Sequence, residues 1–125
     1  MIKKLIFSLL LSQGLLVGSA IAQANYPDKP ITLIQGFGAG GNSDTIARII
    51  APGLAKELGQ QIVVEAKTGA GGNIASAAVA KSAPDGYTLL LVSPTISTNP
   101  TLLPNLPYKT PDAFAPVAQV ITYAM

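Results

Sequence analysis

The hydrophobic residues of this chain form short continuous runs that alternate with stretches of helical spacing. Apolar runs at 31–35, 61–65 and 87–92 predict strands, because unbroken hydrophobicity is typical of strands that are covered on both faces. Apolar residues spaced three and four apart between 43 and 59, and a small-residue stretch at 73–81, predict helices. Strands that alternate with helices predict a parallel, three-layer α/β sheet.

Capping and turn residues mark the ends of the predicted helices. Asn42 or Ser43 is expected to cap the first helix, which Gly59 would end. Pro52 lies inside this helix and predicts a kink or a break, because it removes one backbone hydrogen bond. Asn73 is expected to cap the second helix.

The pattern becomes irregular after the third predicted strand. Ser93-Pro94-Thr95 closes that strand, and five prolines between residues 99 and 116 predict a long loop with one short helical turn. The apolar run 117–125 predicts a fourth strand, whose neighbours later chain would have to supply. We therefore interpret the chain as incomplete, or as one part of a larger architecture.

Residues 1–24 have the pattern of a secretion signal. Lys3 and Lys4 precede an apolar core at 5–17, and small residues allow cleavage after Ala22 or Ala24. Polar residues and glycines interrupt the core, which falls short of the ~20 apolar residues that a spanning helix needs. We expect residues 25–125 to be the exported domain.

The composition narrows the possible chemistry. The chain has no cysteine or histidine, so it has no disulfides, and it lacks the commonest metal ligand and general base. Without the signal, six basic residues balance six acidic ones, which gives no argument for nucleic-acid binding. The serines have no histidine to activate them, and Asp44, Glu65 and Asp85 fit no metal-ligand spacing. We expect a binding protein rather than an enzyme, without metal or cofactor.

Two glycine-rich turns follow the first two predicted strands. The string G-A-G-G-N at 38–42 recurs at 69–73. Glycine allows positive φ and close approach of a ligand, and each following helix directs unpaired N–H groups toward the same space. Because the carboxyl ends of parallel strands share one edge, the two turns would form one cradle for an anion. The alternative is that small residues simply end each strand.

The alternatives are a fragment of a dinucleotide-binding oxidoreductase and a truncated fragment with no function of its own. The sequence bears on the first of these. G-x-G-x-x-G at 36–41 separates a strand from a helix, and Glu65 ends the next strand, where a ribose-binding acid would lie. The secretion signal, the lack of histidine and the acid Asp44 near the pyrophosphate position argue against it. A nucleotide phosphate loop fails because Asn42 replaces its lysine. The remaining candidate is a carboxylate held by backbone and small hydroxyls, with Arg48 facing solvent.

Short motifs along the chain carry a family resemblance. They are Y-P-D-K-P-I-T-L-I (26–34), G-G-N-S-D (40–44), I-A-R-I-I-A (46–51), L-G-Q-Q-I-V-V-E (58–65), G-A-G-G-N-I (69–74), V-A-K-S-A-P-D-G-Y-T-L-L (79–90), N-P (99–100), L-P-Y (106–108) and F-A-P-V (114–117). In this order they closely resemble the Bug/TctC receptors, the extracytoplasmic solute-binding components of tripartite tricarboxylate transporters. Where the family's first turn commonly reads P-F-A-P-G-G, Gly36 and Ala39 replace both prolines, so we expect a looser turn.

The resemblance implies a type II periplasmic binding protein with two lobes. Residues 25–125 would be the N-terminal part of the solute-binding domain, in its first lobe and truncated before the second lobe, with strands in the spatial order 2-1-3. The resemblance also implies a monomer in the periplasm that binds a small organic acid or amide and no nucleic acid, with membrane transporter subunits as partners. The implied ligand-binding residues lie in the first turn, in the second turn and after the third strand: Phe37, Gly38, Ala39, Gly40, Gly41, Asn42, Ser43, Asp44, Thr68, Gly69, Ala70, Gly71, Gly72, Asn73, Ser93, Thr95 and Ser97.

Overall fold

A parallel sheet of three strands forms the centre of the protein. The structure, a computed structural model, describes residues 26–109 and 112–122, so the predicted signal at 1–24 lies outside the described residues. Strands β1 (Ile31–Gln35), β2 (Ile62–Ala66) and β3 (Thr88–Leu91) are parallel and lie in the order β2-β1-β3. The predicted α/β class and the predicted strand order are both confirmed.

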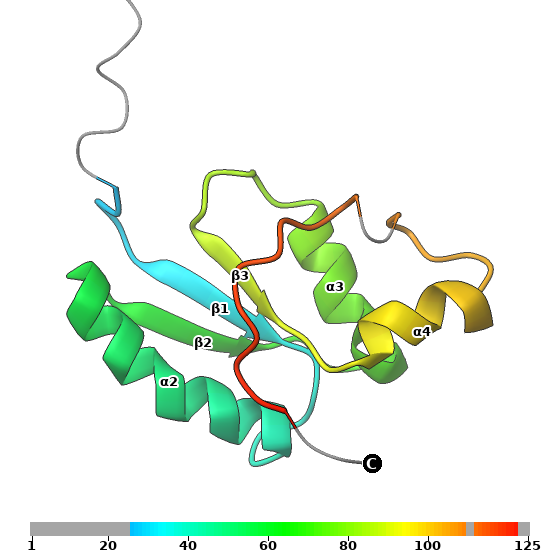
Figure 1. Cartoon of the computed structure of the whole chain (residues 1–125), viewed down its shortest axis with the longest axis horizontal. Coiled ribbons are helices and arrows are strands. Elements are labelled where there is room, and N and C mark those ends of the chain that lie inside the picture. The colour runs from blue at the N-terminus through cyan, green and yellow to red at the C-terminus, as the bar shows by residue number, and fades with distance from the viewer. Residues whose placement is uncertain (1–25, 110–111, 123–125) are drawn as a thin grey trace, which may run out of the picture.

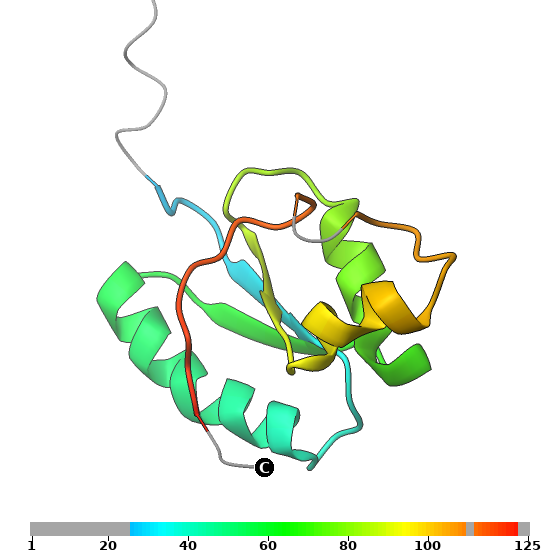
Figure 2. The same ribbon diagram turned by 45° about the vertical axis from the view of Figure 1, so that its right-hand side comes forward.

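Helices cover both faces of this sheet and complete the three layers (Figures 1 and 2). Helix α2 (Asn42–Leu58) packs on β1 and β2, and α3 (Asn73–Ala80) packs on β3 and β1 from the other side. The apolar run of β1 is unbroken because this strand has a neighbour on each edge and a helix on each face. The hydrophobic core consists of Ile31, Leu33, Ala47, Ala51 and Ile62.

Two predictions about α2 need correction. The helix begins at Asn42 with Gly41 as its N-cap, and no side chain caps it, so neither Asn42 nor Ser43 is the cap. The helix also continues through Pro52, so of the predicted kink or break the break is wrong, and the kink stays a prediction. Pro52 is exposed, and water can therefore satisfy the Arg48 carbonyl that loses its helical partner. The predicted helix end at Gly59 is confirmed, since this residue is a left-handed C-cap.

The chain after β3 differs most from the prediction. A helix, α4 (Thr95–Leu102), begins four residues before the expected irregular loop. Ser93-Pro94 is a helix-start signal, because proline presets the φ angle of the first turn; Pro94 has a φ of −55°. The predicted fourth strand is wrong for residues 117–122, which pair with no strand in the described part of the chain, and Val117 is 85% exposed. Residues 123–125 lie outside the described residues.

The amino end of the sheet is tied to the chain that precedes it. Tyr26 Oη donates a hydrogen bond to the Gly86 carbonyl at 2.8 Å, and its ring contacts the Tyr87 ring edge-on. Lys29 pairs with Asp85 at 3.4 Å and lies over the Tyr87 ring. This cluster is at the edge of the sheet opposite the glycine-rich turns, where the strands begin.

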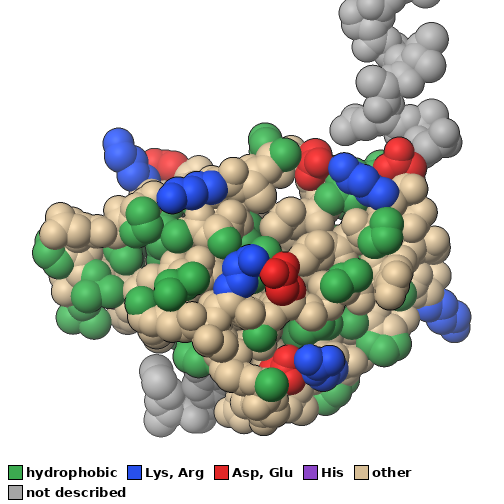
Figure 3. Space-filling view, turned by 180° about the vertical axis from the view of Figure 1, so that it is seen from behind, with side chains coloured by type: hydrophobic (Ala, Val, Ile, Leu, Met, Phe, Trp, Pro, Cys, Tyr) green, Lys and Arg blue, Asp and Glu red, His purple; other side chains and the backbone are tan. Residues whose placement is uncertain are grey.

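Several charged side chains of the described residues form neighbouring pairs of opposite sign. Figure 3 shows basic and acidic side chains side by side on the rear face, and the ion pairs include Lys29–Asp85, Arg48–Asp44 and Lys67–Glu65. In the ranges 26–109 and 112–122, no helix has both the length and the hydropathy needed to cross a membrane.

Candidate functional site

Three turns meet at the carboxyl edge of the sheet (Figure 1). A Cβ built on Gly36, directly after β1, would lie 2.6 Å from the Gly72 Cα, so the first and second turns touch backbone to backbone. Thr95, after β3, lies beside the second turn, with its Oγ1 3.5 Å from the Gly71 carbonyl. The prediction that the glycine-rich turns share one edge of the sheet is therefore confirmed.

The first turn is held by a buried network of polar side chains. Gln35 is fully buried, and its Oε1 accepts the Phe37 N–H at 2.7 Å. Its Nε2 lies 3.4 Å from Asp44 Oδ1. Asp44 Oδ2 accepts the Gly40 N–H at 3.0 Å and the Arg48 Nε–H at 2.9 Å. These bonds and the contact of Gly36 with the second turn fix the turn at several points. That it is looser than a turn with prolines at positions 36 and 39 stays a prediction.

The charge of Asp44 is satisfied inside the protein. Hydrogen bonds from the Arg48 guanidinium and then from the Gly40 N–H hold the pKa of the Asp44 carboxyl below its ordinary value, while burial opposes this shift. The Asp44 side chain is 5% exposed and that of Arg48 is 62% exposed. Arg48 faces solvent as expected, yet it also pairs with this acid, as the i,i+4 spacing on a helix permits.

The second turn has the same five letters as the first but a different backbone. Ala70–Gly72 form a short 3₁₀ helix, and Ala70, Gly71 and Gly72 all have positive φ. Gly72, not Asn73, is the N-cap of α3, so the prediction for Asn73 is wrong. The Asn73 side chain instead donates to the Ala70 carbonyl and accepts from Asn99 Nδ2 at 2.8 Å and from Tyr108 Oη at 2.6 Å.

The residues after β3 form the third part of this edge. Ser93 Oγ and Thr95 Oγ1 share a hydrogen bond of 2.7 Å, and Ser97 is exposed two residues further along α4. Asn99 and Tyr108 were absent from the predicted site, although both support the second turn through Asn73. The Asn99-Pro100 and Leu106-Pro107-Tyr108 motifs marked these positions in the sequence, but their contact with Asn73 depends on the path of the loop.

The predicted site residues differ in how far they reach solvent. Only Asp44 and Asn73 have buried side chains engaged by other protein groups, whereas the remaining members are exposed or half-buried. The exposed members are Gly38, Ala39, Gly40, Asn42, Thr68, Gly69, Ala70, Gly71 and Ser97. The half-buried members are Phe37, Gly41, Ser43, Gly72, Ser93 and Thr95. The accessible polar groups are therefore mainly backbone groups and hydroxyls.

The helix beginnings make this edge suitable for an anion. Helices α2, α3 and α4 all begin directly after the three turns, and no side chain caps any of them. The first N–H groups of a helix have no i−4 partner within it, and its dipole favours negative charge there. The Asn73 N–H at the start of α3 already bonds the Ala70 carbonyl, and those of Ile96 and Ser97 in α4 bond the Ser93 and Pro94 carbonyls. Within the described residues, no group of three or more His, Cys, Asp or Glu side chains could hold a metal ion.

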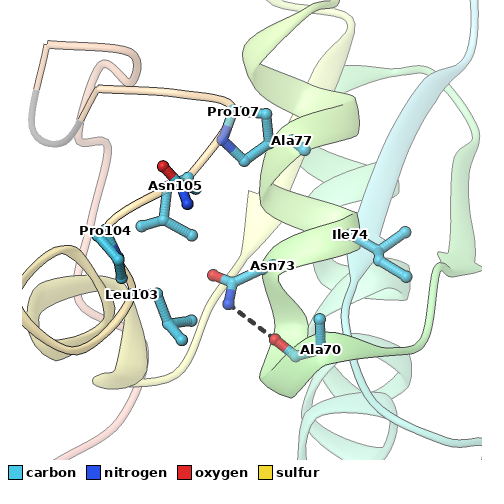
Figure 4. A pocket seen from close by; sticks show the side chains of 9 residues that line it. Ala70, Asn73, Ile74, Ala77, Leu103, Pro104, Asn105 and Pro107 are labelled. Atoms are coloured by element: carbon cyan, nitrogen blue, oxygen red, sulfur yellow. Dashed lines mark hydrogen bonds between the residues drawn. The ribbon is translucent and has the colours of Figure 1, made fainter.

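A hollow of about 440 Å³ lies beside the second turn (Figure 4). It separates α3 from the loop after α4, and its lining is mainly apolar, with Ile74, Ala77, Leu103 and Pro104 among its residues. Asn73 reaches this hollow, but its amide already bonds the Ala70 carbonyl (Figure 4). The hollow therefore offers a carboxylate fewer free polar groups than the turns do.

Known proteins that are similar to this chain point to one family. A family model described as "Tripartite tricarboxylate transporter family receptor" matches residues 46–125. A relative from Agrobacterium vitis, described as a UPF0065 protein in the TAR-I ttuE-ttuC' intergenic region, is 43% identical over 118 residues, which are 94% of this chain and 34% of the relative.

Two solved structures share both the fold and a large part of the sequence. The periplasmic binding protein BugD is 43% identical with a TM-score of 0.65, over 67% of this chain and 28% of that chain. MatC from Rhodopseudomonas palustris with bound malate is 41% identical with a TM-score of 0.63, and the match covers 67% of this chain and 29% of MatC.

These matches also define how much of the family this chain represents. The chain spans about a third of the length of the curated relatives that it matches. The family model covers more than half of the chain, and the solved structures have the same parallel sheet with flanking helices. The chain belongs to the receptor family of the tripartite tricarboxylate transporters.

Proposed function

We propose that this chain is the N-terminal part of a periplasmic receptor that captures a small carboxylate, or a related amide-bearing solute, for a tripartite tricarboxylate transporter. The observation that carries this proposal is the meeting of three uncapped helix beginnings and two glycine-rich turns at one edge of the sheet. A carboxylate is suited to such an edge, because backbone N–H groups and helix dipoles stabilise negative charge. MatC, a similar protein, is described with bound malate.

The proposed ligand wall consists of the first turn, the second turn and the residues that follow β3. The accessible N–H groups at the start of α2 and the hydroxyls of Ser93, Thr95 and Ser97 would contact the ligand. A second lobe of the longer receptor would close on it from the other side. The chain would act as a binding protein, not an enzyme, and as a monomer that presents its ligand to membrane transporter subunits. Residues 1–24 would be removed on export to the periplasm.

A dinucleotide site has weaker support. Glu65, the expected ribose-binding acid, is exposed on the outer strand β2 and forms an ion pair with Lys67 at 2.7 Å. The family model that matches this chain is described as a transporter receptor, and BugD, which is 43% identical, is described as a periplasmic binding protein. Both observations favour the carboxylate receptor.

The first test of this function is a thermal melt of the chain with a panel of ligands. The panel contains di- and tricarboxylates, amino acids, nicotinamides and NAD. A ligand at a hundred times its dissociation constant stabilises the folded state by about 2.7 kcal/mol, a visible shift for a domain of this size. We expect a dicarboxylate such as malate to raise the midpoint. A rise with NAD alone would instead favour the dinucleotide site, and no shift with any member would contradict binding by this chain.

A matched pair of variants connects the shift to the proposed site. Asn42 is the first residue of α2, where proline is tolerated, and Gly41 has the extended conformation that precedes proline well (φ −73°, ψ 170°). Asn42→Pro therefore removes one backbone N–H from the turn while the helix is retained, whereas Asn42→Ala keeps it. We expect the malate shift to fall in Asn42→Pro and to persist in Asn42→Ala. Equal shifts in the two variants would place the ligand elsewhere.

A further inference from the structure

Two buried polar side chains, Gln35 and Asp44, lie against the first turn. Gln35 is 0% exposed and Asp44 is 3% exposed, although polar residues of these types are mostly found at protein surfaces. Burying them costs free energy unless each polar atom finds a partner. Their partners are the backbone N–H groups of Phe37 and Gly40, which belong to the turn itself. The hydrogen bonds of these two buried side chains therefore hold both halves of the turn in place.

The two side chains hold different parts of the turn. Gln35 Oε1 fixes the start of the turn through Phe37, and Asp44 Oδ2 fixes its far side through Gly40. Gln35 Nε2, 3.4 Å from Asp44 Oδ1, connects these two points. Gly40 has a φ of +77°, a conformation that the Asp44 bond helps to keep. A turn fixed in this way needs less ordering when a ligand binds.

The Asp44 carboxylate also creates an electrostatic problem. It is a negative charge directly behind a turn proposed to receive another negative charge, and like charges weaken each other's binding. Arg48 Nε donates to the same oxygen that accepts the Gly40 N–H. The positive guanidinium therefore cancels the charge of Asp44 at the oxygen closest to the turn. It remains 62% exposed, so it reaches Asp44 from the solvent side of α2.

We propose that Gln35, Asp44 and Arg48 are positioning residues: Gln35 and Asp44 hold the first turn in its binding conformation, and Arg48 neutralises Asp44 so that the turn accepts a carboxylate. This inference rests on the proposed function. It gives Asp44 a role behind the turn in place of direct contact with the ligand. It also assigns the selectivity for anions over amides to an ion pair that need not touch the ligand.

The positioning role can be tested without any ligand. Amide hydrogen exchange of the chain is measured residue by residue for the wild type, Gln35→Leu, Asp44→Ala and Asp44→Asn. Losing a hydrogen bond of ordinary strength should speed exchange at Phe37 in Gln35→Leu, and at Gly40 in Asp44→Ala, by about three- to tenfold. Asp44→Asn keeps an acceptor and should retain most of the protection at Gly40. Unchanged exchange at Gly40 in Asp44→Ala would overturn the positioning role.

The neutralising role requires two probes of the same shape but different charge. Malate and malamide, its uncharged diamide, are titrated into the wild type, Arg48→Met and the double variant Arg48→Met/Asp44→Asn. Exposing the Asp44 charge should lower the malate-to-malamide affinity ratio by about three- to tenfold, because it repels only the anion. The double variant should restore the ratio. Lys29→Met, which removes a positive charge at the opposite edge of the sheet, is the matched control and should leave the ratio unchanged.

Each outcome of this titration supports or overturns the neutralising role of Arg48. A purely structural role would change the affinities for malate and malamide alike, and that result would overturn the neutralising role. A ratio that falls in Arg48→Met but does not recover in the double variant would also overturn it. If the wild type binds neither probe, the proposed function fails and the neutralising role fails with it. The exchange experiment would then still decide whether Gln35 and Asp44 position the turn.

Discussion

At the scale of single residues, one five-residue string has two different uses in this protein. Asn42, at the end of the first copy, is exposed at the start of α2. Asn73, at the end of the second copy, is 7% exposed and bonds Ala70, Asn99 and Tyr108. The difference comes from the surroundings, because only the second copy is covered by the loop after α4.

This contrast predicts unequal effects of the same substitution. Asn73→Ala should lower the free energy of unfolding by about 1–3 kcal/mol, because the Tyr108 hydroxyl and the Asn99 amide lose their acceptor. Asn42→Ala, at the matching exposed position, should change it by less than about 0.5 kcal/mol. Urea denaturation of both variants measures the difference. Equal losses would mean that Asn73 does not connect the loop to the second turn.

Single residues also show which contacts of the site the sequence did not predict. Asp44 was predicted as a ligand-wall residue and Gln35 was only a strand residue, yet they bond each other and the same turn. The spacing of nine residues gave no signal of this contact. It arises because the chain reverses in the first turn and brings the start of α2 back to the end of β1.

At the scale of elements, α2 is a long helix with two weak positions in its middle. Pro52 and Gly53 are both exposed, and both lower helix propensity. The helix persists because Ala47 and Ala51 are buried against the sheet and Leu54 packs beside them. Tertiary packing thus outweighs local propensity in this segment.

Gly53 offers a stabilising substitution in this helix. A Cβ at this position would meet nothing within 4 Å, so Gly53→Ala should raise the free energy of unfolding by about 0.5–1 kcal/mol. Gly59→Ala is the control with the opposite sign, since Gly59 has a φ of +67° at the end of the helix. Denaturation midpoints of both variants test the prediction. A loss of stability in Gly53→Ala would contradict it.

At the scale of the whole molecule, acid should weaken the fold through two carboxylates at opposite edges of the sheet. Arg48 and Gly40 lower the pKa of Asp44, and the Tyr87 N–H followed by Lys29 lowers the pKa of Asp85. A carboxyl whose pKa is lower in the folded state stabilises that state above its unfolded value, here 3.8. This stability is lost as the pH falls through that value toward the lower, folded pKa.

Chemical denaturation between pH 7 and pH 2 should therefore show a free energy of unfolding that is steady near neutrality and falls below about pH 5. Asp85→Asn removes one of the two contributions without touching the glycine-rich turns, so its profile should be flatter than that of the wild type. A wild-type profile that rises toward acid, or an equal slope in the variant, would contradict this assignment of the acid sensitivity.

The sequence by itself determined the parallel α/β sheet, the strand order implied by the family resemblance and the edge where the turns meet. The sheet class and the edge where the turns meet follow from the local hydrophobic pattern and from the rule that parallel strands end together, whereas the strand order came from the family resemblance. The confirmed helix end at Gly59 follows from the C-cap chemistry of glycine, and the confirmed receptor family follows from the ordered set of short motifs.

Only the tertiary structure decided which polar groups are already occupied. The buried bonds of Gln35, Asp44 and Asn73 join residues whose partners are set by the path of the chain, not by spacing. For the same reason the apolar run at 117–122 gave a wrong strand, since a strand needs a neighbour and no local pattern supplies one. A sequence shows what each residue can do, whereas packing decides which of those bonds are made.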